Sequence, residues 1–319
     1  MPALAWVKAI HIAASALLVG AFAFEVLVLR RIGLPAEDAM LARELQGRLR
    51  QLAICGVVAA ALTWLAWLGM LAISMSGQPA GEALTPSVLG TVIAQTAFGR
   101  TWLLRAGLMV ALAALLFSPA AARRKGRAIG AGLSLLLACT LAGAGHALGT
   151  QPLHTVVDAV HLIAASVWLG MLPPLWIVIR RACARSEPAW TSLAAAAARQ
   201  FSLPGMIAVG TLAATGLGNA LWLLASPRDL VATKYGQVLL AKLAAFALML
   251  MLAAGNRMFF APAARQAGSA SARMQALRRL RASVLLEMAL GALVLALVGL
   301  LGVTAPGTQG EHAHHMEGM

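Results

Sequence analysis

The sequence contains few charged residues and few cysteines. Only 11% of its 319 residues are Asp, Glu, Lys or Arg, whereas 61% are hydrophobic, and the mean hydropathy is +0.82. This composition excludes an ordinary soluble domain. The three cysteines, Cys55, Cys139 and Cys183, are scattered and form no Cys-x-x-Cys pair. The sequence therefore indicates neither a disulfide framework nor a thiolate metal site.

Motifs of several other function classes are also missing. The chain has no nucleotide-binding loop and no phosphorylation-type aspartate motif, which argues against an ATP-driven pump. It has no surface-like stretch that combines basic and aromatic residues, so we expect no nucleic-acid partner. The environment that this composition fits is the lipid bilayer.

Long apolar runs recur along the chain. A helix needs about 20 apolar residues to cross about 30 Å of hydrocarbon, and runs near that length occur eight times. The first run is too long, and too poorly supplied with a cleavage site, for a removable signal peptide. We therefore predict an all-α integral membrane protein with eight transmembrane helices, at residues 5–29, 52–75, 101–118, 128–148, 155–179, 203–225, 236–260 and 282–303.

The basic residues predict how these spans are oriented. The loops after the first, third, fifth and seventh spans hold 19 of the 25 Lys and Arg residues. Because basic loops stay on the inner side, both termini are predicted to be periplasmic. All seven histidines then fall on the outer side. The net charge of +14 reflects this retention signal together with attraction to anionic lipid.

The chain repeats itself at a spacing of about 150 residues. His11 and His161 match, and a glycine follows nine residues after each, at Gly20 and Gly170. Each predicted half has four spans, so both halves enter the membrane in the same direction, related by an axis along the membrane normal. We predict a first four-helix membrane repeat at residues 1–150, a second at 151–305, and a His- and Met-rich periplasmic tail at 306–319.

A polar stripe marks the fifth predicted span. His154, Asp158 and His161 are spaced i, i+4 and i+7, so a helix stacks them on one face. Imidazole ligands suit copper, and the thioethers of a Met-containing tail favour its cuprous state, although zinc also accepts imidazole and carboxylate. A lone intramembrane histidine such as His11 could instead only bond a neighbouring helix. The candidate metal ligands are His146, His154, Asp158, His161, His11, His312, His314 and His315.

Four of the charged residues within the predicted spans need an explanation of their own. Arg105 and Lys242 recur in both repeats and either extend toward the outer interface or form a positive lining that holds an anionic group or pairs with Asp158. Glu25 and Glu287 lie near the inner ends. We expect both glutamates to form salt bridges. Alternatively, they could bind a cation where it leaves the protein on the inner side. The arginines expected to pair with them are Arg30, Arg257 and Arg281.

Several short patterns carry a family resemblance. They are Gly145-His146, Asp158-x-x-His161, Trp168-x-Gly170, Thr233-Lys234-Tyr235-Gly236 with Lys242, and Glu287 before Gly291. Together they resemble the CopD/PcoD family of bacterial copper-resistance membrane proteins, over most of the chain. The resemblance implies a copper transporter or copper-binding protein of the inner membrane rather than an enzyme. It also implies movement of copper toward the cytoplasm and a small soluble periplasmic copper carrier, which we expect as a separate protein.

Two other functions stay open at this stage. The family is distantly similar to four-helix membrane cytochromes, so His11 and His161 could be the axial ligands of one haem b on the outer side. A copper-dependent oxidoreductase that exchanges electrons with quinone belongs to the same alternative. Two stacked haems would need histidines in the inner half, where the sequence has none. The remaining possibility is a sensor or scaffold that binds copper without moving it.

Overall fold

The computed structural model describes residues 2–33, 38–142, 152–223, 226 and 228–304, and in these ranges the chain is helical without a strand. Seven continuous helical stretches there are long and apolar enough to cross a membrane. They agree with seven of the eight predicted spans, and the all-helical membrane class is confirmed. The stretches are Ala3–Ile32, Ala39–Ser76, Phe98–Phe117, Leu153–Arg185, Pro188–Leu221, Lys234–Gln266 and Ala270–Leu301.

The remaining predicted span, 128–148, lies partly outside the described residues. Within it the structure has helix α7, Arg124–Cys139, whose 16 residues cover about 24 Å at 1.5 Å per residue. That length is short of the hydrocarbon thickness. The helices of the first half are α1 (Pro2–Phe24), η1 (Glu25–Leu29), α2 (Arg30–Ile32), α3 (Ala39–Ser76), α4 (Ala80–Ala83), α5 (Pro86–Gln95), α6 (Ala97–Phe117), η3 (Pro119–Ala122) and α7.

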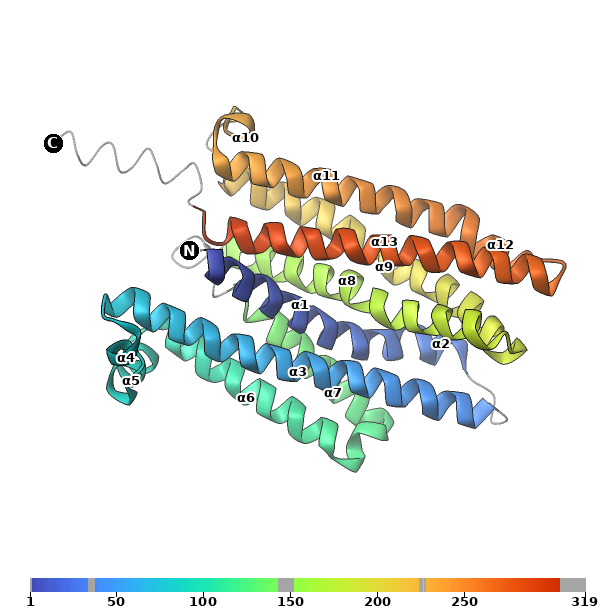
Figure 1. The fold of residues 1–319 in the computed structure, drawn as a ribbon, viewed down its shortest axis with the longest axis horizontal. Helices are drawn as coiled ribbons and strands as arrows, with labels where there is room; N and C mark the ends of the chain where they lie inside the picture. The colour runs from blue at the N-terminus through green and yellow to red at the C-terminus, as the bar shows by residue number, and fades with distance from the viewer. Residues whose placement is uncertain (1, 34–37, 143–151, 224–225, 227, 305–319) are drawn as a thin grey trace.

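Two groups of helices lie side by side along one common direction (Figure 1). In the first group α1 packs against α3 and α7, and α6 closes the group by contacting both α3 and α7. In the second group α8 packs against α9 and α13, and α11 contacts α13. The second half consists of α8 (Pro152–Arg185), α9 (Pro188–Leu223), α10 (Asp229–Ala232), α11 (Lys234–Gly255), η5 (Asn256–Phe260), α12 (Ala261–Gln266) and α13 (Ala270–Leu301).

The starts of α6 and α11 are fixed by the same local contact. Thr96 precedes α6, and its hydroxyl accepts a hydrogen bond of 2.9 Å from the Gly99 backbone N–H. Thr233 precedes α11 and accepts a bond of the same length from Gly236. A threonine at this position satisfies a backbone donor that the first helical turn leaves without a partner. The matching Thr-x-x-Gly patterns of the sequence are therefore helix starts.

The two helix groups meet where α1 crosses α8, and glycines make this crossing possible. A Cβ atom on Gly20 would lie 1.8 Å from the carbonyl carbon of Gly170, and one on Gly170 would lie 1.9 Å from the carbonyl oxygen of Ala16. Both distances are far below van der Waals contact. Small residues at a helix crossing let two backbones approach closely inside a membrane. The glycine that follows each repeated histidine by nine residues therefore sets the central contact.

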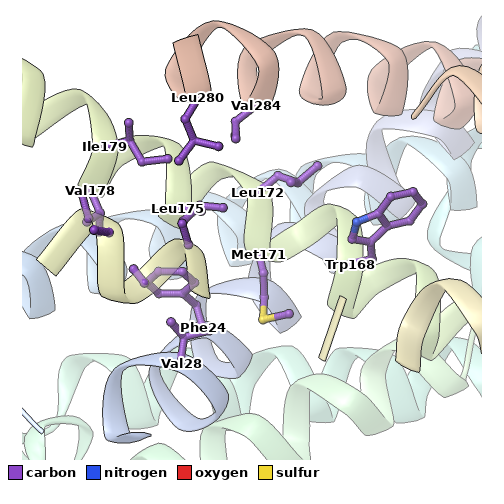
Figure 2. Packing of buried hydrophobic residues seen from close by; sticks show 14 of the residues in the cluster. Phe24, Val28, Trp168, Met171, Leu172, Leu175, Val178, Ile179, Leu280 and Val284 are labelled. Atoms are coloured by element: carbon purple, nitrogen blue, oxygen red, sulfur yellow. The ribbon is translucent and has the colours of Figure 1, made fainter. Parts of the chain in front are cut away.

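The largest hydrophobic cluster lies around α8. Its buried members include Trp168, Met171 and Leu175 on α8, together with Phe24 on α1 and Leu280 on α13 (Figure 2). Residues from η1, α3, α9, α11 and α12 also belong to the cluster. The buried residues that α8 contributes run from Ala164 to Ala182, so this core anchors the helix directly after the stripe that bears His154, Asp158 and His161.

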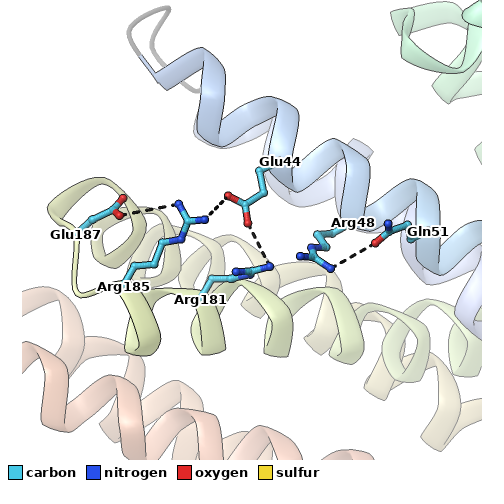
Figure 3. Close-up of polar contacts among 6 residues, drawn as sticks. All are labelled: Glu44, Arg48, Gln51, Arg181, Arg185 and Glu187. Carbon is cyan, nitrogen blue, oxygen red and sulfur yellow. Dashed lines mark hydrogen bonds and ion pairs between the residues drawn. The ribbon is translucent and has the colours of Figure 1, made fainter.

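The arginine-rich loops gather at one end of the bundle. Glu44 of α3 forms ion pairs with Arg181 (3.3 Å) and Arg185 (3.1 Å) at the end of α8 (Figure 3). Arg127 of α7 pairs with Glu25 at 2.8 Å. The start of α1 and the last turn of α13 lie at the opposite end, where the Lys8 ammonium donates to the Gly302 carbonyl. The structure thus separates the basic loops from the end that carries His154.

Candidate functional site

His11 is enclosed by the helices of the first group. Its Nδ1 lies 2.8 Å from the Thr63 hydroxyl on α3, and its Nε2 contacts the Arg105 guanidinium of α6. Because a guanidinium only donates, Nε2 accepts and Nδ1–H must donate to Thr63. The Thr63 hydroxyl in turn donates to the Ala59 carbonyl at 2.6 Å. Both ring nitrogens of this fully buried histidine are therefore engaged.

His161 has a threonine at Nδ1, as His11 does, but no arginine contacts its Nε2 among the described residues. Its Nδ1 lies 2.9 Å from the Thr215 hydroxyl on α9, which donates at 2.6 Å to the Thr211 carbonyl. By the same donor count, Nδ1 carries the proton and Nε2 keeps its lone pair. Among the described residues, Nε2 of His161 has no hydrogen-bond partner. A fixed tautomer with one available nitrogen is the arrangement typical of a metal-ligating histidine.

Asp158 lies one helical turn before His161 on the same face of α8. The Asn219 amide of α9 donates to it at 3.3 Å, and Lys242 of α11 and His154 lie close enough to interact with its charge. Lys242 also interacts electrostatically with His161. The second helix group thus encloses an imidazole nitrogen, a carboxylate and an ammonium group at the end away from the arginine-rich loops.

The predicted ligands are only partly brought together. His154, Asp158 and His161 share the predicted stripe, whereas His11 faces α3 and α6 in the other helix group. Within the described ranges, no three His, Cys, Asp or Glu side chains are close enough to hold one metal ion. The other four predicted ligands, His146, His312, His314 and His315, lie outside the described residues.

Three expectations for buried charges need correction. Arg105 does not extend to the interface, since it is fully buried and donates to the Leu137 carbonyl at 3.1 Å as well as contacting His11. The terminal nitrogens of its guanidinium find acceptors at the Leu137 carbonyl, the Thr140 hydroxyl and His11, whereas its Nε–H has no hydrogen-bond partner among the described residues. Glu25 pairs with Arg127 rather than Arg30. Glu287 is buried and accepts a hydrogen bond from the Asn256 amide of η5 instead of pairing with an arginine.

Sequence reasoning missed the threonines that hold the two histidines. Thr63 follows His11 by 52 residues, whereas Thr215 follows His161 by 54. Because the two spacings differ, an alignment of the two halves without a gap does not place Thr63 opposite Thr215. The useful signal is the residue type, since a threonine inside an apolar span needs an acceptor and is able to orient an imidazole on a neighbouring helix.

Comparison with known proteins places this arrangement in a family. The family model described as "Copper resistance protein D" matches residues 195–301, and the model "Copper resistance protein D-like, N-terminal domain" matches residues 1–156. The inner membrane protein YebZ of Escherichia coli (strain K12) is 31% identical over 230 residues, which cover 70% of this chain and 74% of that protein. The chain belongs to the CopD family.

Other family relatives carry copper in their names. Copper resistance protein D of Pseudomonas syringae pv. tomato is 29% identical over 74% of this chain and 77% of its own length. The copper transport protein CutJ of Bacillus subtilis (strain 168) is 29% identical over 222 residues. These residues cover 66% of this chain but only 40% of that protein. No solved structure is significantly similar. This CopD-family chain is thus a membrane protein of the copper resistance and transport group.

Proposed function

We propose that this CopD-family protein binds copper through His161, Asp158 and His154 and moves it across the bacterial inner membrane from the periplasm toward the cytoplasm. The observation that carries the proposal is the His161 side chain, whose Nδ1 is bonded to Thr215 and whose Nε2 has no partner among the described residues. An imidazole held in this way is prepared to give its lone pair to a soft cation.

The neighbouring groups support a copper site at this histidine. Asp158 supplies an anionic oxygen within one helical turn of His161, and His154 lies a further turn toward the helix start. The backbone positions of these three residues extend over about 10 Å along α8, and among the described residues no three such side chains are placed to hold one ion. We therefore propose that residues outside the described ranges complete the site, with His146 first among them because it closely precedes α8. His312, His314 and His315 are proposed to gather copper for it.

His11 is left out of the proposed site. It occupies the position that matches His161, but the Arg105 guanidinium contacts its Nε2 and Thr63 occupies its Nδ1. The same engagement leaves it no nitrogen for a haem iron, and no family relative reported above is named as a cytochrome. We propose that the His11–Arg105 contact holds the first helix group together.

The proposed orientation of the protein in the membrane rests on charge asymmetry. The arginine-rich loops lie at the end of the bundle away from His154, and such loops stay in the cytoplasm. The copper ligands and both chain termini then face the periplasm, where a separate soluble carrier would deliver copper. We further propose that the two helix groups are repeats of one four-helix unit, because the His–Thr bond and the Thr helix start recur in both.

A binding titration and a flux assay test the proposal. Purified protein in detergent is titrated with Cu(I) against a competing chelator, and His161→Ala is compared with His11→Gln as the matched control. We expect His161→Ala to abolish the tightest site and His11→Gln to leave its stoichiometry unchanged. Radiocopper uptake into proteoliposomes should fall in the first variant only. Equal copper binding by wild type and His161→Ala would reject the site, whereas normal binding with no uptake would reject transport.

A further inference from the structure

A large apolar cavity lies in the second helix group, at the arginine-rich end and separate from the proposed copper site. Its volume is about 620 Å³, and its inner walls are Trp168, Leu172 and Leu175 of α8 facing Leu280 and Val284 of α13 (Figure 2). A cavity of this size accepts a hydrocarbon chain or a small apolar molecule. Nothing in the copper chemistry proposed above uses it.

The cavity opens sideways, between α9 and the stretch from α11 to α12. The lining residues that are exposed come from these two walls, with Leu203 and Met206 on α9 48% and 43% exposed. Since α9 is a membrane-spanning helix, its exposed leucine and methionine face lipid. The opening is therefore accessible from the bilayer, and its occupant can be a membrane lipid.

Three arginines surround the end of this opening. Arg199 lies on α9, Arg257 on η5 and Arg265 on α12, and all three line the cavity. Arg257 reaches across the opening to the Ser202 hydroxyl. Within the described ranges, Arg199 and Arg265 have no carboxylate partner. The nearest acid of the lining, Glu287, is 1% exposed and bonded to Asn256, so it does not neutralise them.

The spacing of charged and apolar lining residues fits an amphiphile. Arg199, Leu203 and Met206 follow one another at about one-turn intervals on α9, so the arginine stands about 6 Å from the leucine and about 10 Å from the methionine. A molecule seated in the opening would place its polar group at the arginines and its hydrocarbon chain deeper, beside the leucine and the methionine. Arginine guanidinium groups bind phosphate oxygens strongly because their donors match the phosphate geometry.

The corresponding cavity of the first helix group lacks these properties. It is smaller, about 290 Å³, and Glu25 and Arg127 form an ion pair within its lining. Arg50, which also lines it, donates to the Leu116 carbonyl at 2.8 Å. Arg127 and Arg50 are thus already engaged, and only Arg43 of this lining has neither a hydrogen bond nor an ion pair among the described residues, whereas two such arginines, Arg199 and Arg265, line the second-group cavity. The two helix groups of the same molecule therefore differ in both room and available positive charge.

We propose that the second-group cavity is a binding site for one anionic phospholipid, with its phosphate on Arg199, Arg257 and Arg265 and an acyl chain between α9 and α11, against the inner wall formed by α8 and α13. Anionic lipids concentrate in the leaflet that faces basic loops, which supplies the ligand where the opening lies. The lipid would fill the space that separates α9 from α11 and so support the helix group that carries His161. This site is independent of the copper proposal.

The test counts lipids bound to the full-length protein. Delipidated protein is titrated with dioleoyl phosphatidylglycerol or dioleoyl phosphatidylcholine, and bound lipid is measured by native mass spectrometry. We expect one phosphatidylglycerol to bind at least about tenfold more tightly than phosphatidylcholine. Glutamine at all three arginines should remove this preference. The control replaces Arg31, Arg123 and Arg279, which are exposed arginines outside the cavity, and should retain it.

A second variant tests the binding of the acyl chain separately from that of the headgroup. Ala253→Phe places a ring into the apolar lining and leaves the three arginines intact, so it should weaken both lipids. Equal binding of the two lipids by wild type, or the same loss in the control triple variant, would overturn the proposal. Displacement of phosphatidylglycerol by millimolar inorganic phosphate would also overturn it, since that result identifies a free-anion site.

Discussion

The hydroxyl of Thr215 should control copper affinity, because within the described ranges it is the group that is hydrogen-bonded to the proposed ligand His161. Thr215→Val removes the hydroxyl and keeps the side-chain shape. The bond that it removes spans 2.9 Å and joins a threonine that is itself anchored to the Thr211 carbonyl at 2.6 Å. Without it, the imidazole is free to rotate and to move its proton to Nε2, the nitrogen that is proposed to bind copper.

The structure contains its own control for this perturbation. Thr63→Val removes an equivalent hydroxyl, which lies 2.8 Å from His11 Nδ1 and donates to the Ala59 carbonyl at 2.6 Å. Both threonines are half-buried. The two variants thus delete the same group in the same setting, and only one of them acts on a histidine whose Nε2 is available.

The expected magnitude follows from the single hydrogen bond that is lost. Such a bond contributes about 1 kcal/mol net, and loss of the outer partner of a metal-ligating histidine weakens metal binding about 10- to 100-fold. Because about 1.4 kcal/mol corresponds to tenfold, we expect a rise of about five- to twentyfold in the Cu(I) dissociation constant for Thr215→Val. Thr63→Val should change it less than about twofold. A chelator-competition titration measures both, and equal weakening by the two variants would refute the assignment of copper to His161.

Further predictions concern charge and packing. Lys242→Met removes a cation beside the proposed site, so Cu(I) should bind about five- to tenfold more tightly in the same titration; weaker binding would contradict the proposed repulsion. Gly170→Ala should lower the melting temperature in detergent at a cost of about 1–3 kcal/mol, whereas Gly210→Ala, in open space, should not. Asn256→Leu should lower the free energy of unfolding by about 1–3 kcal/mol, because it leaves the Glu287 carboxyl without its partner. The double variant with Glu287→Met should recover most of this stability in the same melting experiment.

The proposed copper ligands show how much the residue pattern could predict. The i, i+4, i+7 spacing predicted the shared face of His154, Asp158 and His161, because a helix has a fixed 3.6-residue period. The sequence repeat matched His11 with His161, but the two histidines have different surroundings in the structure. Arg105 contacts His11 Nε2, while Lys242 at the matching position makes no hydrogen bond to His161 within the described ranges. Which partner reaches a ring depends on helix rotation, and a single sequence does not encode that locally.

The sequence by itself determined that this chain is an all-helical membrane protein with its basic loops on one side, because apolar length and charge act through the bilayer and need no tertiary contact. Its short patterns also identified the CopD family. Only the tertiary structure decided that α1 and α8 touch at Gly20 and Gly170, and that the two histidines face separate helix groups. Those features depend on how rigid helices pack against one another, a property of pairs of segments far apart in the chain.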